Sequence, residues 1–259
     1  MLAIGAHPDD LEILAAGTLA LYARAGHDVT MAVATNGNVG HPTLGREEIA
    51  AIRHREARAA ADLIGAELVW MDFDDEWLFN DRPTRERFID VIRGAHPDVV
   101  LAHSPTDYHP DHRNAGQVTV DARIPAAVRL VETTLPAAER IPHVFLMDCV
   151  GGIDFVPELY VDVTETMALK EQMLLCHESQ DTWLRHFVGM DYVSFMREHT
   201  RRRGEECGRP WAEAFREVKT YPAVGSSELL PAVVHPPGRR APVSAWPQAN
   251  RRASVSPAH

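Results

Sequence analysis

Residues 1–26, MLAIGAHPDDLEILAAGTLALYARAG, decide the fold. The apolar run over residues 2–6 predicts a buried strand, and the apolar residues over 11–25 recur with the spacing of a helix. Asp9 and Asp10 are candidates for the N-cap of that helix. A strand that leads directly into a helix predicts a layered α/β protein, with the polar sequence HPDD at the turn between the two elements.

The same alternation of strands and helices continues through the first two-thirds of the chain. Further strands are expected over residues 29–34, 68–72, 99–103 and 144–148, and helices over 47–63, 83–94 and 114–131, the last interrupted by Pro125. Such repetition is typical of parallel sheets that are covered on both faces. The sequence therefore predicts an α/β fold, a Rossmann-like, doubly wound, mainly parallel sheet with helices on both faces.

The pattern changes after about residue 150. We expect a late strand over 160–163 and two further helices, which together form a smaller C-terminal α/β extension. Six prolines fall after residue 230 among Ser, Ala and Arg, with few large apolar residues. We therefore expect one domain over 1–225 and a Pro/Ser/Arg-rich extended tail over 226–259 that has no core of its own.

Composition limits the classes of partner. The chain has 259 residues, with 37 acidic against 26 basic side chains and a formal net charge of −11. A nucleic-acid partner is not expected, because a phosphate-binding surface normally requires an excess of basic residues. No membrane partner is expected either, because no apolar run reaches the length of a membrane span. The 3 cysteines form no CxxC motif and the first ten residues lack a signal-peptide pattern, so we expect a cytoplasmic location.

Two short motifs of similar chemistry lie about a hundred residues apart. HPDD at residues 7–10 follows the first expected strand, and HPDH at residues 109–112 follows the fourth. In a doubly wound sheet of order 3-2-1-4-5, strands one and four are neighbours, and the winding reverses between them. Ligands bind such sheets at the carboxyl ends of these strands. We therefore expect the two motifs to converge on one site.

Together the motifs supply two imidazoles, a carboxylate and a further carboxylate beside them. Zinc binds these ligand types, and with open positions it lowers the pKa of bound water to about 7. A neighbouring carboxylate can then remove a proton near neutrality, which suits the hydrolysis of an amide. Two histidines and one carboxylate also match the facial triad of non-haem Fe(II) oxygenases, so Fe²⁺ stays an alternative to Zn²⁺.

Several segments together resemble the LmbE-like/PIG-L family of zinc-dependent N-deacetylases. The resemblance spans roughly residues 1–222 and lies in AHPDDLE at 6–12, the TNG turn at 35–40, the helix with Ile52, Arg53, Glu56 and Ala57, HPDH at 109–112, HESQ at 177–180, and the segments 203–204 and 212–215. HPDD and HPDH at this separation form a specific signal, whereas either motif alone is weak.

The resemblance implies roles for the motif residues. His7, Asp10 and His112 would be the zinc ligands, and Asp9 would be the general base for the attacking water. Asp9 precedes a ligand in the chain and projects differently from it, so it can face the water while Asp10 holds the metal.

The remaining two residues of HPDH complete the implied machinery. His109 would stabilise the oxyanion of the tetrahedral intermediate or protonate the leaving amine. A donor to such an oxyanion is commonly worth about 10²–10³ in rate. Asp111 would orient or tune His109, because a carboxylate beside a histidine fixes its tautomer and favours the imidazolium.

The resemblance also implies substrate contacts. Arg53 and Asp74 or Asp75 look like family residues that contact sugar hydroxyls. Asn38 stands in the turn bordering the site, where many family members have Glu. His177, in HESQ, is either a structural cap or a residue on the substrate side.

The leading hypothesis is a zinc-dependent amidohydrolase that removes an N-acetyl or other N-acyl group from an amino-sugar conjugate. Its partner would be a small molecule, and the family resemblance is compatible with a homo-oligomer. A mycothiol-S-conjugate-type amidase of the same fold and the Fe(II) oxygenase are the alternatives. A third hypothesis, a binding protein with a degenerate site, finds no support, because every core position of both motifs is filled.

Overall fold

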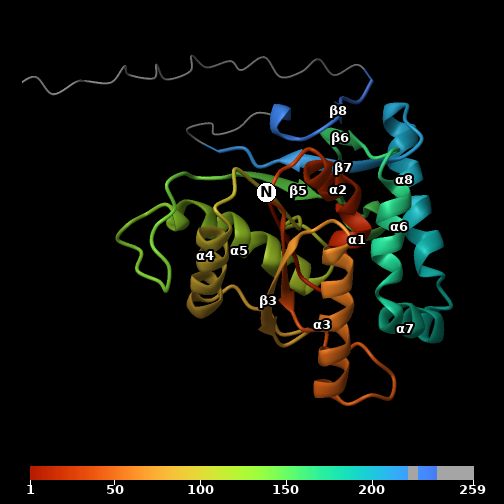
Figure 1. The fold of residues 1–259 in the computed structure, drawn as a ribbon, viewed down its shortest axis with the longest axis horizontal. Helices are drawn as coiled ribbons and strands as arrows, with labels where there is room; N and C mark the ends of the chain where they lie inside the picture. Colours follow the sequence, from red (N-terminus) through yellow and green to blue (C-terminus); the bar gives the residue numbers. More distant parts are fainter. Residues whose placement is uncertain (221–226, 238–259) are drawn as a thin grey trace, which may run out of the picture.

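The computed structural model describes residues 1–220 and 227–237. Its strands form one 8-stranded sheet in the order β3-β2-β1-β4-β5-β7-β6-β8 (Figure 1). The strands are β1 Leu2–Gly5, β2 Thr30–Thr35, β3 Glu67–Phe73, β4 Val99–Ala102, β5 His143–Met147, β6 Leu159–Asp162, β7 Ala212–Glu217 and β8 Val233–Val234. Strands β1 to β5 pair in parallel, whereas β7 and β8 join the sheet antiparallel.

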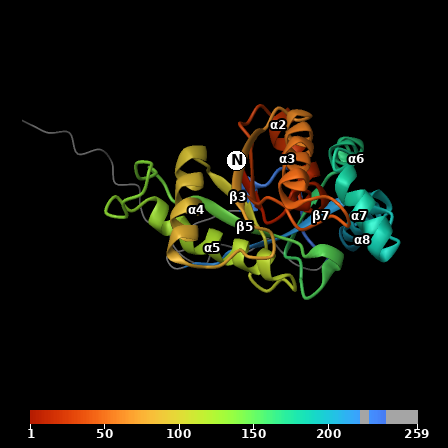
Figure 2. The same cartoon turned by 90° about the horizontal axis from the view of Figure 1, so that it is seen from below.

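Helices cover both faces of this sheet. They are α1 Asp10–Leu14, α2 Ala16–Arg24, α3 Arg46–Asp62, α4 Arg82–Ala95, α5 Pro110–Ala126, α6 Met167–Leu175, α7 Glu178–Val188 and α8 Tyr192–Cys207, with short 3-10 turns η1 Val150–Gly152 and η2 Ser227–Leu229. In Figure 2, α4 and α5 lie on one side of the strands, and α2 and α3 lie on the other. The doubly wound, mainly parallel α/β fold expected from the sequence is confirmed, including the order of its first five strands.

The two faces bury two separate apolar cores. Along β1, Leu2 and Ile4 pack into the core beneath α4 and α5, whereas Ala3 packs into the core beneath α1, α2 and α3. This alternation follows from the period of two in a strand. Because both faces are buried, the parallel strands appear in the sequence as continuous apolar runs.

The expected first helix is in fact two helices. Ala15 leaves the helical conformation with φ of −144°, so α1 ends at Leu14 and α2 begins at Ala16. The cause lies far along the chain, because the carboxylate of Glu213 accepts hydrogen bonds from the backbone N–H groups of Gly17 and Thr18, both at 2.8 Å. A carboxylate at that position satisfies backbone donors that a continuous helix would use internally.

A buried ion pair extends this contact. The Lys170 ammonium in α6 donates to Glu213 Oε1 at 2.5 Å and to the carbonyl oxygen of Ile13 at 2.7 Å, and both charged side chains are buried. The C-terminal extension is therefore tied to the first helical segment through β7 and α6.

Three further elements differ from the expectation. Helix α5 begins at Pro110 rather than at Asn114, and α7 and β7 were not expected. Part of the segment expected as a tail belongs to the fold, since β8 pairs with β6 and Leu230 is buried. Residues 226 and 238–259 of that segment lie outside the described residues.

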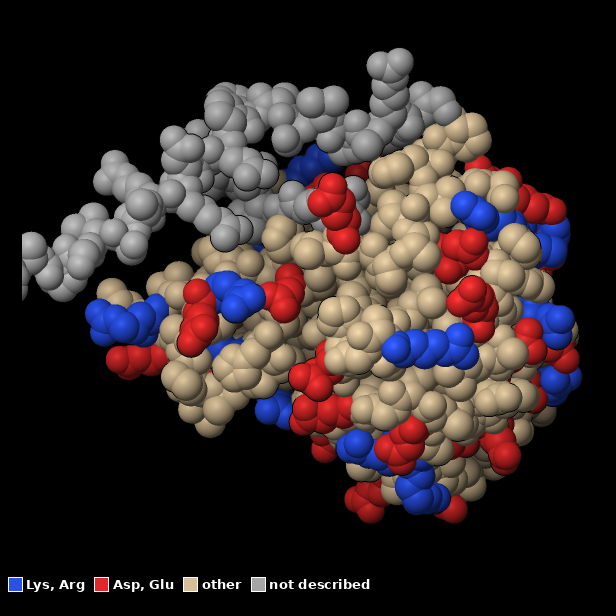
Figure 3. All heavy atoms as spheres, turned by 45° about the horizontal axis from the view of Figure 1, so that its top comes forward, with Lys and Arg blue, Asp and Glu red and all other residues tan. Residues whose placement is uncertain are grey.

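The surface carries charges of both signs. On the face in Figure 3, acidic and basic side chains are interspersed. No helix in the described part of the chain combines the length and the apolar character needed to cross a bilayer.

Candidate metal centre

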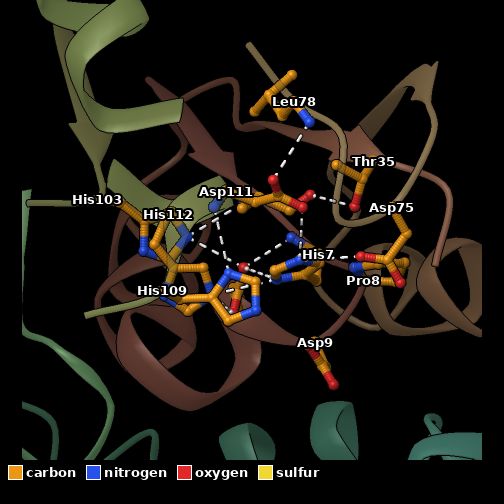
Figure 4. Close-up of polar contacts among 12 residues, drawn as sticks. His7, Pro8, Asp9, Thr35, Asp75, Leu78, His103, His109, Asp111 and His112 are labelled. Atoms are coloured by element: carbon orange, nitrogen blue, oxygen red, sulfur yellow. Dashed lines mark hydrogen bonds and ion pairs between the residues drawn. The ribbon is translucent and has the colours of Figure 1, made fainter. Parts of the chain in front are cut away.

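The two HPD motifs meet where β1 and β4 end. These strands are parallel neighbours in the sheet. His7 lies two residues beyond β1, and His112 lies in the first turn of α5, the helix that follows β4. Residues that are 105 positions apart in sequence are thereby in contact, at the point where the winding of the sheet reverses (Figure 4).

Three side chains present ligand atoms at metal-binding separations. His7 Nδ1 lies 3.1 Å from His112 Nε2. Asp10 approaches both rings, with Oδ2 at 3.4 Å from His7 Nδ1 and Oδ1 at 3.2 Å from His112 Nε2. A tetrahedral zinc ion with bonds of about 2.0–2.1 Å needs ligand atoms about 3.3–3.4 Å apart. The residues present therefore fit a small divalent ion.

The other nitrogen of His7 faces carboxylates. His7 Nε2 lies 3.1 Å from Asp75 Oδ1 and 3.3 Å from Asp111 Oδ2. Burial lowers the pKa of His7, but Asp10, Asp111 and Asp75 outweigh it and raise the pKa well above its ordinary value. Carboxylates behind a metal-binding histidine fix the ring and its tautomer.

His112 has the same kind of support. Its Nδ1 lies 3.2 Å from Oδ1 of Asp107, a fully buried residue in the loop before α5. Burial opposes protonation of His112, but Asp10 and Asp107 raise its pKa to about 9. Both histidines thus direct one nitrogen to the common centre and the other to an outer carboxylate.

The third ligand candidate, Asp10, is held as a charged carboxylate. Its Oδ2 accepts a hydrogen bond from the backbone N–H of His7 at 2.7 Å and lies 3.0 Å from Nε2 of the buried His103. Burial alone would raise the pKa of Asp10, but the imidazoles of His112 and His103 lower it well below its ordinary value.

Other donor sets overlap with this one. The donor atoms of His7, His109 and His112 also lie within 4.8 Å of one another, as do those of Asp10, His103 and His112. His103 Nε2 also accepts a hydrogen bond from the backbone N–H of Ala6 at 3.1 Å. Because the Ala6 N–H already occupies this nitrogen and His103 is fully buried, we place His103 behind the ligands rather than among them.

Asp9 has a different environment from its neighbour Asp10. Its side chain points away from the imidazoles and toward the C-terminal helices (Figure 4). Asp9 Oδ2 accepts hydrogen bonds from the Tyr192 hydroxyl at 2.5 Å and from Arg53 Nη2 at 3.3 Å. Burial raises the pKa of Asp9 to about 6, despite the opposing charge of Arg53. A carboxylate with such a pKa suits a general base near neutral pH.

His109 lies at the N-terminus of α5 and borders the same centre. Its ring centroid is 4.7 Å from those of both His7 and His112. Its Nδ1 accepts the backbone N–H of Asp111 at 3.2 Å, so the proton is on Nε2, which lies 3.5 Å from Glu76 Oε1. Burial and the charges of His7 and His112 lower the pKa of His109.

The carboxylate of Asp111 does not contact His109. It lies beside His7 and accepts the backbone N–H of Leu78 at 3.2 Å (Figure 4). It also accepts the backbone N–H of Glu76 at 2.8 Å. Asp111 therefore joins the loop after β3 to the centre, and only its backbone contacts His109.

A cavity of about 350 Å³ opens onto the centre. One wall is polar and contains the ligand candidates, Asp9, Asp75, Glu76 and His109. Other lining side chains are largely apolar and come mostly from the C-terminal helices: Trp183, Leu184, Met190, Tyr192 and Phe195. The size lies within the range of small-molecule sites.

The structure separates the expected substrate residues into two groups. Arg53 and Asp75 line the cavity. Asn38, Asp74 and His177 lie outside its lining: Asn38 Nδ2 donates to Asp74 Oδ1 at 2.7 Å, and His177 Nε2 lies 3.4 Å from the buried Glu12.

The TNG turn makes room for Arg53. Gly37 has φ of 66°, and a Cβ atom there would lie 2.6 Å from Arg53 Cδ. Glycine at this position therefore satisfies both the backbone conformation and the close approach of the guanidinium.

The sequence indicated no role for Asp107, Tyr108, Met190, Tyr192 or Phe195, which the structure places at the centre or the cavity. Asp107 lies two residues before HPDH, and this closeness was the one available signal. Tyr192 and Phe195 carry no motif, since their position depends on how α8 packs against α6, α7 and the sheet.

Comparisons with known proteins agree with this geometry. A family model described as PIG-L, GlcNAc-PI de-N-acetylase, matches residues 2–123. The chain is 30% identical over 196 residues to diacetylchitobiose deacetylase of Thermococcus kodakarensis, covering 71% of this chain and 72% of that protein. It is 27% identical over 192 residues to 4-oxalmesaconate hydratase of Pseudomonas putida, covering 70% and 73% respectively. The structure of N,N'-diacetylchitobiose deacetylase from Pyrococcus horikoshii superposes with a TM-score of 0.74 at 27% identity, covering 84% of this chain and 82% of that one.

Proposed function

The chain belongs to the PIG-L family of de-N-acetylases. We propose that it uses zinc to remove an N-acetyl group from an amino-sugar conjugate. One observation carries the proposal: His7 Nδ1 and His112 Nε2 stand 3.1 Å apart, each lies 3.2–3.4 Å from one oxygen of the Asp10 carboxylate, and a separate carboxylate, Asp9, lines the same cavity. When bound, zinc would polarise the amide carbonyl and lower the pKa of a coordinated water to about 7.

The side chains of the cavity perform the proton transfers. Asp9 takes a proton from the attacking water as the new carbon–oxygen bond forms at the amide carbon. The protonated Asp9 then gives this proton to the amine nitrogen as the carbon–nitrogen bond breaks. His109, whose protonated Nε2 borders the cavity, donates a hydrogen bond to the carbonyl oxygen as that oxygen gains negative charge. The products are a carboxylic acid and the free amine, so water and amide are consumed in equal amounts.

The walls of the cavity suit a sugar conjugate. Asp75, Glu76 and Gln180 offer hydrogen-bonding groups to hydroxyls, and Trp183 offers an aromatic face to the apolar side of a sugar ring. The relatives with an acetylated chitobiose substrate support a neutral N-acetylated saccharide as the first substrate to test.

A hydration reaction is the second candidate, because a relative at 27% identity is 4-oxalmesaconate hydratase. A base such as Asp9 can equally take a proton from water that adds across a carbon–carbon double bond. The two reactions differ in product, since only hydrolysis releases an amine.

The decisive experiment compares the zinc-loaded protein on both substrate classes. We expect primary amine and acetate to be released from N,N'-diacetylchitobiose or another N-acetylglucosamine conjugate, and no loss of 4-oxalmesaconate. Asp9→Asn should keep bound zinc and lose about 10²–10⁴ in kcat. Asp98→Asn, at a carboxylate exposed on the surface, serves as the matched control.

Two results would contradict the proposal. The first is zinc bound stoichiometrically with no amine released from any N-acetylated sugar in the screen. The second is anaerobically purified protein that contains iron and consumes oxygen, which would favour the Fe(II) oxygenase instead.

A further inference from the structure

Tyr192 is the first residue of α8 and lies 183 positions from Asp9 in the chain. Its side chain is 3% exposed and borders the cavity. The start of α8 is fixed by Asp191, whose carboxylate accepts the backbone N–H of Ser194 at 2.7 Å. The tyrosine hydroxyl is therefore presented to the site by a capped helix terminus rather than by a free loop.

The hydroxyl selects one oxygen of the Asp9 carboxylate. It donates to Oδ2 at 2.5 Å, and Arg53 Nη2 approaches the same oxygen at 3.3 Å. Arg53 is itself held by the carbonyl oxygen of Pro8 at 2.7 Å. Among the described residues, none donates a hydrogen bond to Asp9 Oδ1, so the second oxygen is left for a water molecule in the cavity.

The backbone of Asp9 makes this support necessary. Asp9 has φ of 119°, a strained conformation for a residue with a side chain, and its carboxylate does not cap α1. Local structure thus gives the side chain no anchor. Its orientation depends on Tyr192 and Arg53, which come from α8 and α3.

We propose that Tyr192 is a positioning residue that holds Asp9 Oδ2 and thereby aims Oδ1 at the attacking water. This inference rests on the proposed function, because it takes Asp9 as the general base. It assigns a part of the catalytic arrangement to the C-terminal helices, which contribute no metal-ligand candidate.

The test is Tyr192→Phe, which removes the hydroxyl and keeps the ring. Tyr160→Phe is the matched control, because the Tyr160 hydroxyl also donates to a carboxylate, that of Glu206 at 2.7 Å, away from the cavity. We expect Tyr192→Phe to retain its zinc and its melting temperature relative to the control. We expect its kcat to fall roughly ten- to a hundredfold, as for a lost hydrogen bond to a charged group, with KM changed less than twofold.

A double-mutant cycle separates positioning from a general structural effect. In the Asp9→Asn background, Tyr192→Phe should cause no further loss of kcat, because the two residues act as a unit. An equal fractional loss in both backgrounds would overturn the inference, as would a kcat of Tyr192→Phe equal to that of Tyr160→Phe.

A second measurement keeps the inference independent of the proposed reaction. If the wild-type zinc protein hydrolyses no N-acetylated sugar, the proposed function fails, and crystal structures of wild type and Tyr192→Phe decide the positioning role. A rotated Asp9 carboxylate in the variant supports it, and an unmoved carboxylate overturns it.

Discussion

Asp9 and Asp10 are adjacent in the chain, yet the fold gives them opposite properties. The imidazoles around Asp10 lower its pKa well below the ordinary value, whereas burial raises the pKa of Asp9 to about 6. A metal ligand must stay charged, and a base must accept a proton near neutrality. The strained backbone at Asp9 separates the two side chains, so one dipeptide can serve both purposes.

The outer carboxylates allow a test of the metal centre that leaves every ligand in place. Asp107→Asn removes the charge behind His112 Nδ1, 3.2 Å away, with almost no change in shape. We expect the affinity for zinc to fall about 10- to 100-fold, measured by competition with a chromophoric chelator. Asp121→Asn, a partly exposed carboxylate that pairs with Arg85, should leave the affinity unchanged.

An unchanged affinity in Asp107→Asn would show that Asp107 does not support the ligand. The sequence could not rank this residue, because its partner depends on where α5 begins. Pro110 starts the helix four residues earlier than the periodicity predicted, and this places the His112 ring over the loop that contains Asp107.

At the scale of elements, the buried pair between Lys170 and Glu213 joins α6, β7 and the start of α2. Lys170→Met leaves Glu213 buried without its cation, which for such pairs costs about 3–5 kcal/mol. We expect a loss of that size in the free energy of unfolding, measured with urea. Lys170→Met combined with Glu213→Gln should lose less than Lys170→Met alone, because no uncompensated charge is left.

If the single and double variants are equally stable, charge burial is not the cause, and packing around α6 would explain the loss. The control is Lys219→Met, an exposed lysine paired with Glu158, which should change stability by less than about 1 kcal/mol.

The ion pair between Lys170 and Glu213 also shows why some elements could not be predicted from the sequence. The parallel strands were predicted from apolar runs and turns, and their order from the doubly wound fold class, and both expectations were confirmed. Strand β7 was missed, because three of the six residues of Ala212–Glu217 are charged without regular alternation, and the burial of Glu213 depends on a lysine 43 positions away. The break between α1 and α2 has the same distant cause, so local periodicity could not reveal it.

For the whole molecule, the boundary of the folded unit is a testable quantity. A chain ending at residue 225 lacks β8, the buried Leu230, and the carbonyl oxygen of Leu229, which accepts the Tyr22 hydroxyl. We expect it to be less stable to urea than a chain ending at residue 237 by about 2–3 kcal/mol, the value of one large buried apolar side chain with its hydrogen bonds. If the two chains are equally stable, residues 226–237 do not stabilise the fold, and the domain boundary at residue 225 that we predicted from composition is correct.

The position of β7 has a consequence for how the protein is made. This strand is synthesised after β6 but lies between β5 and β6 in the sheet. On the ribosome, all three zinc-ligand candidates have therefore been synthesised by residue 112. Strand β7, which lies between β5 and β6, begins a hundred residues later at Ala212. The proposed metal ligands are therefore all synthesised before β7 and before Tyr192, which donates a hydrogen bond to Asp9.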